Sequence, residues 1–201
     1  MSDPPSVYPK ALETAFKKGV KNILLCGGFP KSDLTEPVLE AINKTTAAGV
    51  RIVGPQSLGL MTPSEGLNLS YLPSLPPAGE VGLVSQSPGL SCTIIDYVTN
   101  AQCGFSHVID PGFEQVLTVA DYVDMLAFDR KTRCIVLYLE SFQQPRKLLS
   151  AIRLAAANKP VILLKGGQTP GSADIVINNS GAREDEDGVM KRALVRAGAS
   201  S

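Results

Sequence analysis

The alternation of short apolar runs with longer amphipathic segments is the feature that most constrains the fold of this chain. Continuous apolar runs that end at glycine, such as residues 21–28 and 160–167, are typical of strands buried on both faces of a parallel sheet. Helix-like segments with an apolar and a polar face follow such runs, as residues 116–129 and 145–158 illustrate. This alternation predicts an α/β protein with an open parallel sheet and helices on both faces.

A proline-rich stretch divides the pattern into two units. Residues 73–80, PSLPPAGE, have the composition of a linker, and we expect a domain boundary near residue 75. The first unit, residues 1–74, has two predicted strands and a helix that Ser32 or Asp33 can cap. The second unit, residues 75–201, restarts with a strand and repeats the alternation to a final helix. Because the first unit lacks an opening strand and the second a closing strand, we expect a piece of a longer protein.

The composition narrows the classes of function. Lys plus Arg and Asp plus Glu both number 19, and this balance argues against a nucleic-acid or membrane-surface partner. The chain has neither an apolar run of about 18 residues nor a secretory signal, so a cytoplasmic location is predicted. The four cysteines lack CxxC spacing and His107 is the single histidine, which argues against a bound metal.

The loops that follow the predicted strands are the candidate site, because ligands of parallel sheets bind beyond the carboxyl ends of strands. In the loop SQSPG, the hydroxyls of Ser85 and Ser87 and the start of a helix are suited to a phosphate. The alternative is a capping turn, with Ser87 as N-cap and Pro88 at the first helical position. Glu140 ends an apolar strand and is either an acid, base or orienting group, or a solvated strand end.

Five motifs occur in an order and spacing that resemble a known family, and they are RIVGPQSLGLMTP, VGLVSQS, IVLYLES, ANKPVILLKGG and NNSGA. Between about residue 10 and residue 199 the chain resembles the nucleoside-diphosphate-forming acyl-CoA synthetases, relatives of the succinyl-CoA synthetase α-subunit. The resemblance implies the C-terminal part of a Rossmann-like CoA-binding domain over residues 1–74. It implies a flavodoxin-like domain, with helices on both faces of a parallel sheet, over residues 75–201. The family's first CoA-binding strand and its ATP-grasp part are expected to lie outside this chain.

In that family a histidine after the last strand carries phosphate between nucleotide and acyl group, because a neutral imidazole nitrogen is nucleophilic. Asn179 stands at this position, and a carboxamide cannot carry the phosphate. The resemblance implies that Glu140 occupies the position of the glutamate that orients the histidine. Since this family of ADP- or GDP-forming acid–CoA ligases depends on the histidine, we leave open whether this chain is an enzyme. His107 does not match the lost position and is interpreted as structural, with a rescue role at a strand exit as the alternative.

The resemblance also implies two sets of binding residues. The predicted phosphate-binding residues are Ser85, Gln86, Ser87 and Gly181, although Pro88 removes one N–H donor from the turn. The predicted CoA-binding residues are Gly28, Pro55, Gln56 and Ser57. We expect Glu140, Ser85, Ser87 and Asn179 to line one pocket, with Gln56 and Ser57 facing it.

One branch of the resemblance concerns regulation. The stretches GPQSLGLMTPSEGLNLSYLP, GFSHVID and NNSGA are similar to the histidine-less synthetase-like module of bacterial protein lysine acetyltransferases. The leading hypothesis is therefore a non-catalytic module that binds CoA or acyl-CoA, without a metal, as the sensor of an acetyltransferase domain. The alternatives are the α-part of an acyl-CoA ligase working with an ATP-grasp domain or subunit, and an interaction module without a small ligand.

Overall fold

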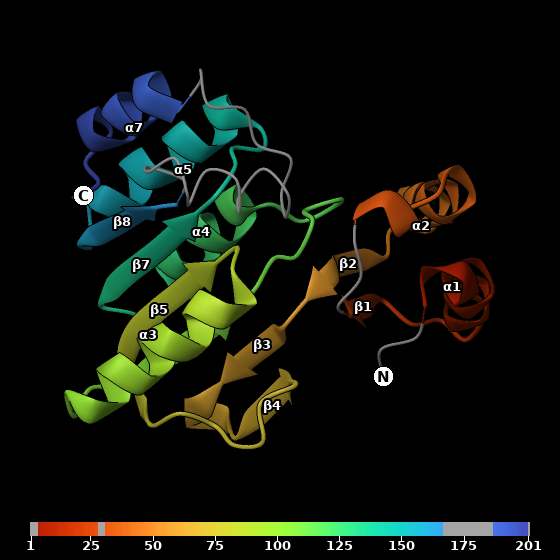
Figure 1. Cartoon of the computed structure of the whole chain (residues 1–201), viewed down its shortest axis with the longest axis horizontal. Helices are drawn as coiled ribbons and strands as arrows, with labels where there is room; N and C mark the ends of the chain where they lie inside the picture. Colours follow the sequence, from red (N-terminus) through yellow and green to blue (C-terminus); the bar gives the residue numbers. More distant parts are fainter. Residues whose placement is uncertain (1–3, 28–30, 167–186, 201) are drawn as a thin grey trace.

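The computed structural model describes residues 4–27, 31–166 and 187–200 of the chain, and within them the strands form two sheets (Figure 1). The smaller sheet pairs β1 (Asn22–Cys26) in parallel with β2 (Arg51–Ser57). A 3₁₀ turn (Pro5–Val7), α1 (Tyr8–Lys17) and α2 (Glu36–Ala47) complete this first unit. Its core contains Leu12 and Ile42 from the helices and Ile52 from β2, all almost fully buried.

The larger sheet has the strand order β4-β3-β6-β5-β7-β8 (Figure 1). Four of its strands are parallel, and they are β5 (Ala78–Ser85), β6 (Phe105–Ile109), β7 (Cys134–Leu139) and β8 (Val161–Lys165). The helices of this unit are α3 (Pro88–Asn100), α4 (Val119–Phe128), α5 (Pro145–Ala156) and α7 (Asp187–Arg196). The predicted α/β fold with helices on both faces of a sheet is confirmed.

Side chains that alternate along the central strands build two cores, one on each face of the larger sheet. On β5, Leu83 packs into the core that includes Ile95 of α3, whereas its neighbour Val84 packs with α4 and α5. On β7, Val136 faces the α3 side, and Ile135 the opposite side. Because strands buried on both faces need apolar residues at every position, the continuous apolar runs of the sequence mark these strands.

An antiparallel hairpin that the sequence analysis missed extends the larger sheet. β3 (Gly59–Thr62) and β4 (Leu67–Ser70) flank a 3₁₀ turn (Pro63–Glu65), and β3 pairs antiparallel with β6. The predicted parallel sheet is thus extended by two antiparallel strands that were not predicted, because strands of four residues each give no clear apolar pattern. Although residues 59–70 precede the expected boundary near residue 75, they pair with the sheet that follows it. The boundary itself stays a prediction.

The short strand β4 forms one edge of the larger sheet, and hydrogen bonds from a side chain of the hairpin satisfy some of the nearby backbone groups. The Asn68 side chain accepts a hydrogen bond from the backbone N–H of Ser70 (3.0 Å) and donates one to the carbonyl of Leu72 (3.0 Å). Gly59 has a φ of +122°, and a side chain there would collide with the backbone of Leu69 on β4. Only glycine accommodates this close approach of the two strands.

The start of α2 differs from the expected capping. Instead of a helix that begins at Ser32 or Asp33, a 3₁₀ turn covers Lys31–Asp33 and α2 begins at Glu36 after Thr35. Pro37 explains the later start, since a proline is tolerated in the first turn of a helix but not in its interior.

In the ranges that the structure describes, no helix is long and apolar enough to cross a membrane.

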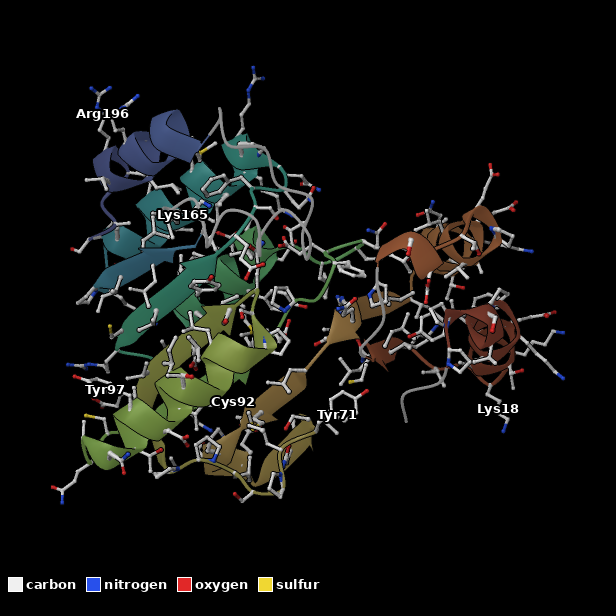
Figure 2. All side chains as sticks on the ribbon, in the orientation of Figure 1. Lys18, Tyr71, Cys92, Tyr97, Lys165 and Arg196 are labelled. Atoms are coloured by element: carbon white, nitrogen blue, oxygen red, sulfur yellow. The ribbon has the colours of Figure 1, made fainter. Side chains whose placement is uncertain are left out.

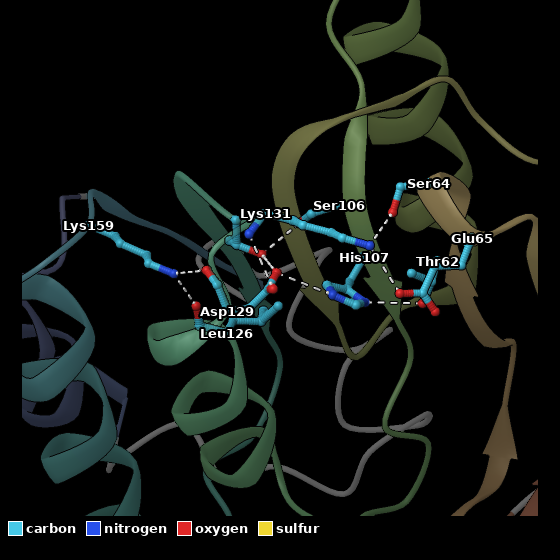
Figure 3. A network of polar contacts seen from close by, with 10 residues as sticks. Thr62, Ser64, Glu65, Ser106, His107, Leu126, Asp129, Lys131 and Lys159 are labelled. Carbon is cyan, nitrogen blue, oxygen red and sulfur yellow. Dashed lines mark hydrogen bonds and ion pairs between the residues drawn. The ribbon is translucent and has the colours of Figure 1, made fainter.

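His107 lies within β6 and belongs to a network of polar contacts between the hairpin and the end of α4 (Figure 3). Its Nδ1 is hydrogen-bonded to Oγ1 of Thr62 (3.1 Å), and its Nε2 lies 3.3 Å from a carboxylate oxygen of Asp129. Thr132 donates to the same carboxylate (2.6 Å) and is hydrogen-bonded to Ser106 (2.7 Å). The expectation that His107 sits at a strand exit was wrong, and its contacts agree with the structural interpretation.

A candidate ligand pocket at the strand exits

A pocket of about 170 Å³ lies where the exits of β2, β5, β6 and β7 converge. Its described lining residues are Gln56, Gln86, Ser87, Pro88, Gly112, Phe113, Glu114, Glu140, Ser141 and Gln143. The pocket thus brings together Glu140, Ser87 and Gln56, which the sequence analysis expected to meet. The exits of β5, β6 and β7 converge because neighbouring parallel strands end at the same edge of a sheet, whereas Gln56 comes from β2 of the smaller sheet.

The turn between β5 and α3 is closed by its own hydroxyl groups. Ser87 is the N-cap of α3, and its Oγ accepts a hydrogen bond from the N–H of Leu90 (3.4 Å) while Pro88 occupies the first turn. Ser85 is fully buried, donates to the carbonyl of Ser87 (3.0 Å) and accepts from the N–H of Ser87 (3.2 Å). These contacts are those of the capping alternative, and the phosphate-binding role of both residues stays a prediction.

Gln86 joins three of the loops through a single side chain. Its Oε1 accepts hydrogen bonds from the backbone N–H groups of Glu140 (2.6 Å) and Ser141 (3.0 Å). Its Nε2 donates to the carboxylate of Glu114 and to the carbonyl of Ser141 (3.2 Å). The side chain therefore fixes the β7–α5 loop to the β5–α3 turn and to the β6–α4 loop. Together these three loops form the wall of the pocket.

Glu140 is 6% exposed, so it is not a solvated strand end. Burial raises the pKa of its carboxyl group, whereas a hydrogen bond from Tyr138 and the charge of Lys165 lower it. Lys165, labelled in Figure 2, donates to the backbone carbonyls of Glu140 (3.1 Å) and Gly166 (2.7 Å). A side chain at Gly166 would collide with the Tyr138 ring, so glycine there leaves room for the tyrosine beside Glu140. The carboxyl group can act as a proton donor or acceptor in the pocket.

Two buried acids next to this pocket were missed by the sequence analysis. The first, Asp110, follows β6 and is 1% exposed. It accepts hydrogen bonds from the N–H groups of Leu58 (3.0 Å) and Gly112 (2.8 Å). Burial raises its pKa to about 6, although these hydrogen bonds favour the charged form. Its place directly after a predicted strand was the signal that could have identified it, since every strand exit is a candidate.

Glu114, the second of these acids, lines the pocket and is 8% exposed. Its φ of 53° lies in the left-handed region, which is uncommon for a residue other than glycine. The carboxylate accepts hydrogen bonds from the N–H of Val119 (2.9 Å), at the start of α4, and from Gln86. Burial nevertheless raises its pKa to about 7. A charged residue in a glycine- and proline-containing loop looks solvent-exposed in the sequence, so nothing local indicated its burial.

The predicted CoA-binding residues at the exit of β2 have different environments. Gln56 lines the pocket, and its buried Oε1 has no hydrogen-bond donor among the described residues. Ser57 is 1% exposed, donates to the carbonyl of Asp110 and accepts from the N–H of Gly59 (2.9 Å). The carbonyl of Pro55 accepts from the N–H of Phe113 (2.8 Å). Of these three residues, Gln56 is the one in the described lining of the pocket, and its unpartnered Oε1 is buried.

Three predicted site residues, Gly28, Asn179 and Gly181, lie outside the described residues. Their predicted roles at the CoA site and at the lost phosphohistidine therefore stay predictions. Within the described ranges, no cluster of His, Cys, Asp and Glu side chains is arranged to hold a metal ion. Glu140 and Glu114 offer hydrogen bonding and proton transfer to a ligand in the described pocket.

Comparison with known proteins identifies the class to which this fold and pocket correspond. The model of the succinyl-CoA ligase-like flavodoxin domain matches residues 78–201, and the chain belongs to this family. An ADP-forming acetate–CoA ligase of Methanocaldococcus jannaschii is 33% identical over 198 residues, covering 97% of this chain and 28% of the relative. The α subunit of acetate–CoA ligase I of Pyrococcus furiosus is 25% identical, covering 97% of this chain and 43% of the subunit.

A solved structure shares the arrangement of both units. The dinucleotide-forming acetyl-coenzyme A synthetase 1 of Ca. Korarchaeum cryptofilum, in complex with phosphate and ADP, superposes with a TM-score of 0.89 at 23% identity. The similarity covers 99% of this chain and 44% of that protein. The chain is thus homologous to the α parts of ADP-forming acyl-CoA ligases but spans less than half the length of these relatives.

Proposed function

We propose that this chain is a synthetase-like module that binds CoA or acyl-CoA at the strand-exit pocket without forming a phosphorylated intermediate. The observation that carries the proposal is the pocket itself, whose wall is fixed by Gln86 and whose lining includes the buried Glu140. A relay needs a nucleophilic nitrogen, and the sequence has Asn179 at the position of the family histidine. Binding is retained in this proposal and phosphate transfer is lost.

The proposed partners follow from the same reasoning. A module that senses acyl-CoA needs an effector, and an acetyltransferase domain, in a cytoplasmic protein, is the one that the sequence resemblance suggests. The second candidate function is the α-part of an acyl-CoA ligase that acts with an ATP-grasp domain or subunit. The similarity to curated ligases, among them the subunit named α in Pyrococcus furiosus, favours this candidate. It requires a phosphate carrier other than Asn179.

Calorimetric titration with CoA and with acetyl-CoA, at matched salt, tests the binding proposal. We expect affinities on the order of micromolar and a clear loss in Gln56→Ala, which removes an amide from the lining. Gln115→Ala is the matched control, because Gln115 is exposed and makes only a 3.4 Å contact with the carbonyl of Phe113. If neither ligand binds the unmodified chain, the binding proposal is wrong.

Labelling with ATP and an ATP-grasp partner separates the two candidates. The unmodified chain is expected to take up no acid-labile phosphate, whereas Asn179→His restores the imidazole that the relay requires. Phosphate uptake by the variant alone supports a binding module derived from a ligase. Uptake by the unmodified chain would instead establish the ligase candidate and a different phosphate carrier.

A further inference from the structure

A groove of about 570 Å³ runs between α1 and α2, apart from the strand-exit pocket. Its described lining comes from these two helices and from the residue that ends α2, and no other described element contributes to it. Figure 1 shows both helices at the end of the molecule opposite the larger sheet. The lining residues are Pro9, Glu13, Phe16, Pro37, Glu40, Ala41, Lys44, Thr45 and Ala48.

Small side chains form the α2 side of the groove, whereas α1 contributes an aromatic ring. Ala41, Thr45 and Ala48 are spaced by four and three residues, which places them on one face of α2. The hydroxyl of Thr45 donates to the carbonyl of Ala41 (2.7 Å), so it needs no partner from outside. Phe16 lines the groove and is 46% exposed. The groove thus combines a face on which another helix can pack closely with a ring that gains from burial.

The charged side chains are ordered along the groove. Because each helix leads into a strand of the parallel pair β1–β2, α1 and α2 run in the same direction. Glu13 and Glu40 come first, and Lys17 and Lys44 follow one turn later on the same helices. The hydrogen bond and charge of Lys17, and the charge of Lys44 on the other helix, lower the pKa of Glu13. An acidic half of the groove is therefore followed by a basic half.

We propose that this groove is the interface for a second copy of the chain, packed antiparallel about a two-fold axis. In this arrangement the acidic half of one groove faces the basic half of the other, so Glu40 of each copy opposes Lys44 of its partner. Phe16 of each copy packs at the end of the other groove that contains Pro9 and Pro37. A parallel arrangement would instead place like charges opposite each other.

The expected strength of this contact is that of a reversible dimer. The formal net charge of the chain is zero at pH 7, so two copies do not repel each other at long range. A contact confined to two helices of each copy belongs to the small interfaces, which form weak and transient complexes. The inference is independent of the proposed function, because the groove and the strand-exit pocket share no lining residue.

Sedimentation equilibrium of the whole chain, from about 10 μM to about 1 mM, tests for the dimer. Phe16→Glu is expected to raise the dimer dissociation constant on the order of tenfold or more, because it places a carboxylate in an apolar contact. Phe128→Glu is the matched control, since Phe128 is 72% exposed at the end of α4 and outside the groove, and it should leave the dimer unchanged. A chain that is monomeric at every concentration, or a dimer that Phe16→Glu does not weaken, would overturn the proposal.

A charge-exchange experiment tests the antiparallel orientation. Glu40 and Lys44 are both exposed, so reversing either charge should leave the fold intact. Glu40→Lys and Lys44→Glu should each dimerise on the order of tenfold more weakly, because like charges then face each other across the interface. An equimolar mixture of the two variants should recover the affinity of the unmodified chain, since every acid in the mixed dimer again faces a lysine. A mixture that associates no better than either variant alone would overturn the proposed interface.

Discussion

Gln86 is a single neutral side chain that connects the loops forming the wall of the pocket. All of its amide hydrogen-bonding groups have protein partners, and these belong to the β6–α4 and β7–α5 loops. A glutamine suits this position because it offers an acceptor and two donors without a charge that would be costly to bury.

Replacement of Gln86 by alanine is expected to destabilise the fold by about 2–4 kcal/mol, because the partly buried N–H groups of Glu140 and Ser141 lose their acceptor. Urea unfolding followed by circular dichroism measures the change. The exposed Gln115→Ala should stay within about 0.5 kcal/mol of the unmodified chain. A loss as small as that control would mean that the Gln86 contacts add no net stability.

The buried acids Asp110 and Glu114 give the chain a distinctive pH dependence. Both have a folded pKa above the ordinary value, about 6 and about 7, so the folded state binds more protons than the unfolded state. Their contribution to stability is therefore complete below the ordinary pKa values of 3.8 and 4.5 and is lost as the pH rises through 6 and 7. The lowered pKa of Asp121 acts in the opposite sense below its ordinary value of 3.8.

We expect the free energy of unfolding to increase by on the order of 1–3 kcal/mol when the pH falls from about 8 to about 5. Denaturant unfolding over this range measures the slope, and Glu114→Gln should flatten it because one of the titrating groups is gone. Glu36→Gln serves as the control and should keep the full slope. A stability that is constant or rises with pH would contradict the assignment of Glu114 and Asp110 as buried acids with raised pKa values.

At the scale of elements, the β6–α4 loop connects the two units of the molecule. Phe113 and Val116 from this loop pack against the core of the first unit. The N–H of Phe113 donates to the carbonyl of Pro55 (2.8 Å). Gly112 permits this approach, since its φ is +64° and a side chain there would collide with the backbone of Pro55 and Gln56.

Gly112→Ala is expected to destabilise the chain by about 1–3 kcal/mol, because alanine meets both a backbone collision and an unfavourable φ. Thermal unfolding measures the loss, and CoA affinity should fall with it because the loop lines the pocket. Gly89→Ala is the matched control: Gly89 is helical with nothing within 4 Å of an added Cβ, so alanine should be neutral or slightly stabilising. Equal stabilities for the two variants would refute the constraint at Gly112.

The sequence predicted the long elements and the place of the pocket, but not the features that depend on tertiary contacts. Apolar runs identified β5 and β7, because strands buried on both faces must be apolar throughout. The apolar run of β8 also predicted its strand, although β8 is buried on one face only, with Ile162 and Leu164 exposed on the other. The hairpin was missed because its strands are too short for a periodic signal. Glu114 was missed because its burial comes from Gln86 and the start of α4, which are distant or unremarkable in sequence.

At the scale of the whole molecule, the hairpin contributes more to the stability of the larger sheet than the proline-rich stretch that follows it. β3 contributes Met61 to the core on the α3 side, where the methionine is 1% exposed. A chain cut within residues 73–80 would keep β6 but lose its neighbour β3. The larger sheet is thus complete only when residues 59–70 are present.

We therefore expect a chain of residues 58–201 to be more stable than one of residues 75–201, by about 2–4 kcal/mol for the lost burial of apolar side chains. Denaturant unfolding and the fraction recovered as monomer measure the difference. A third chain, residues 66–201, keeps β4 without β3 and is the control, since it should behave like the shorter one. Equal stability of the first two chains would place the structural boundary near residue 75 after all.

The short β4 has a consequence for how copies of this protein behave at high concentration. An open sheet edge is a template on which another chain can add a strand and start an aggregate. Here the edge strand is four residues long, and the N–H of Ser70 already belongs to the Asn68 side chain. An incoming strand from another copy would find few free backbone groups and only four residues to pair with. The β4 edge is therefore a poor template for adding a strand from a second molecule.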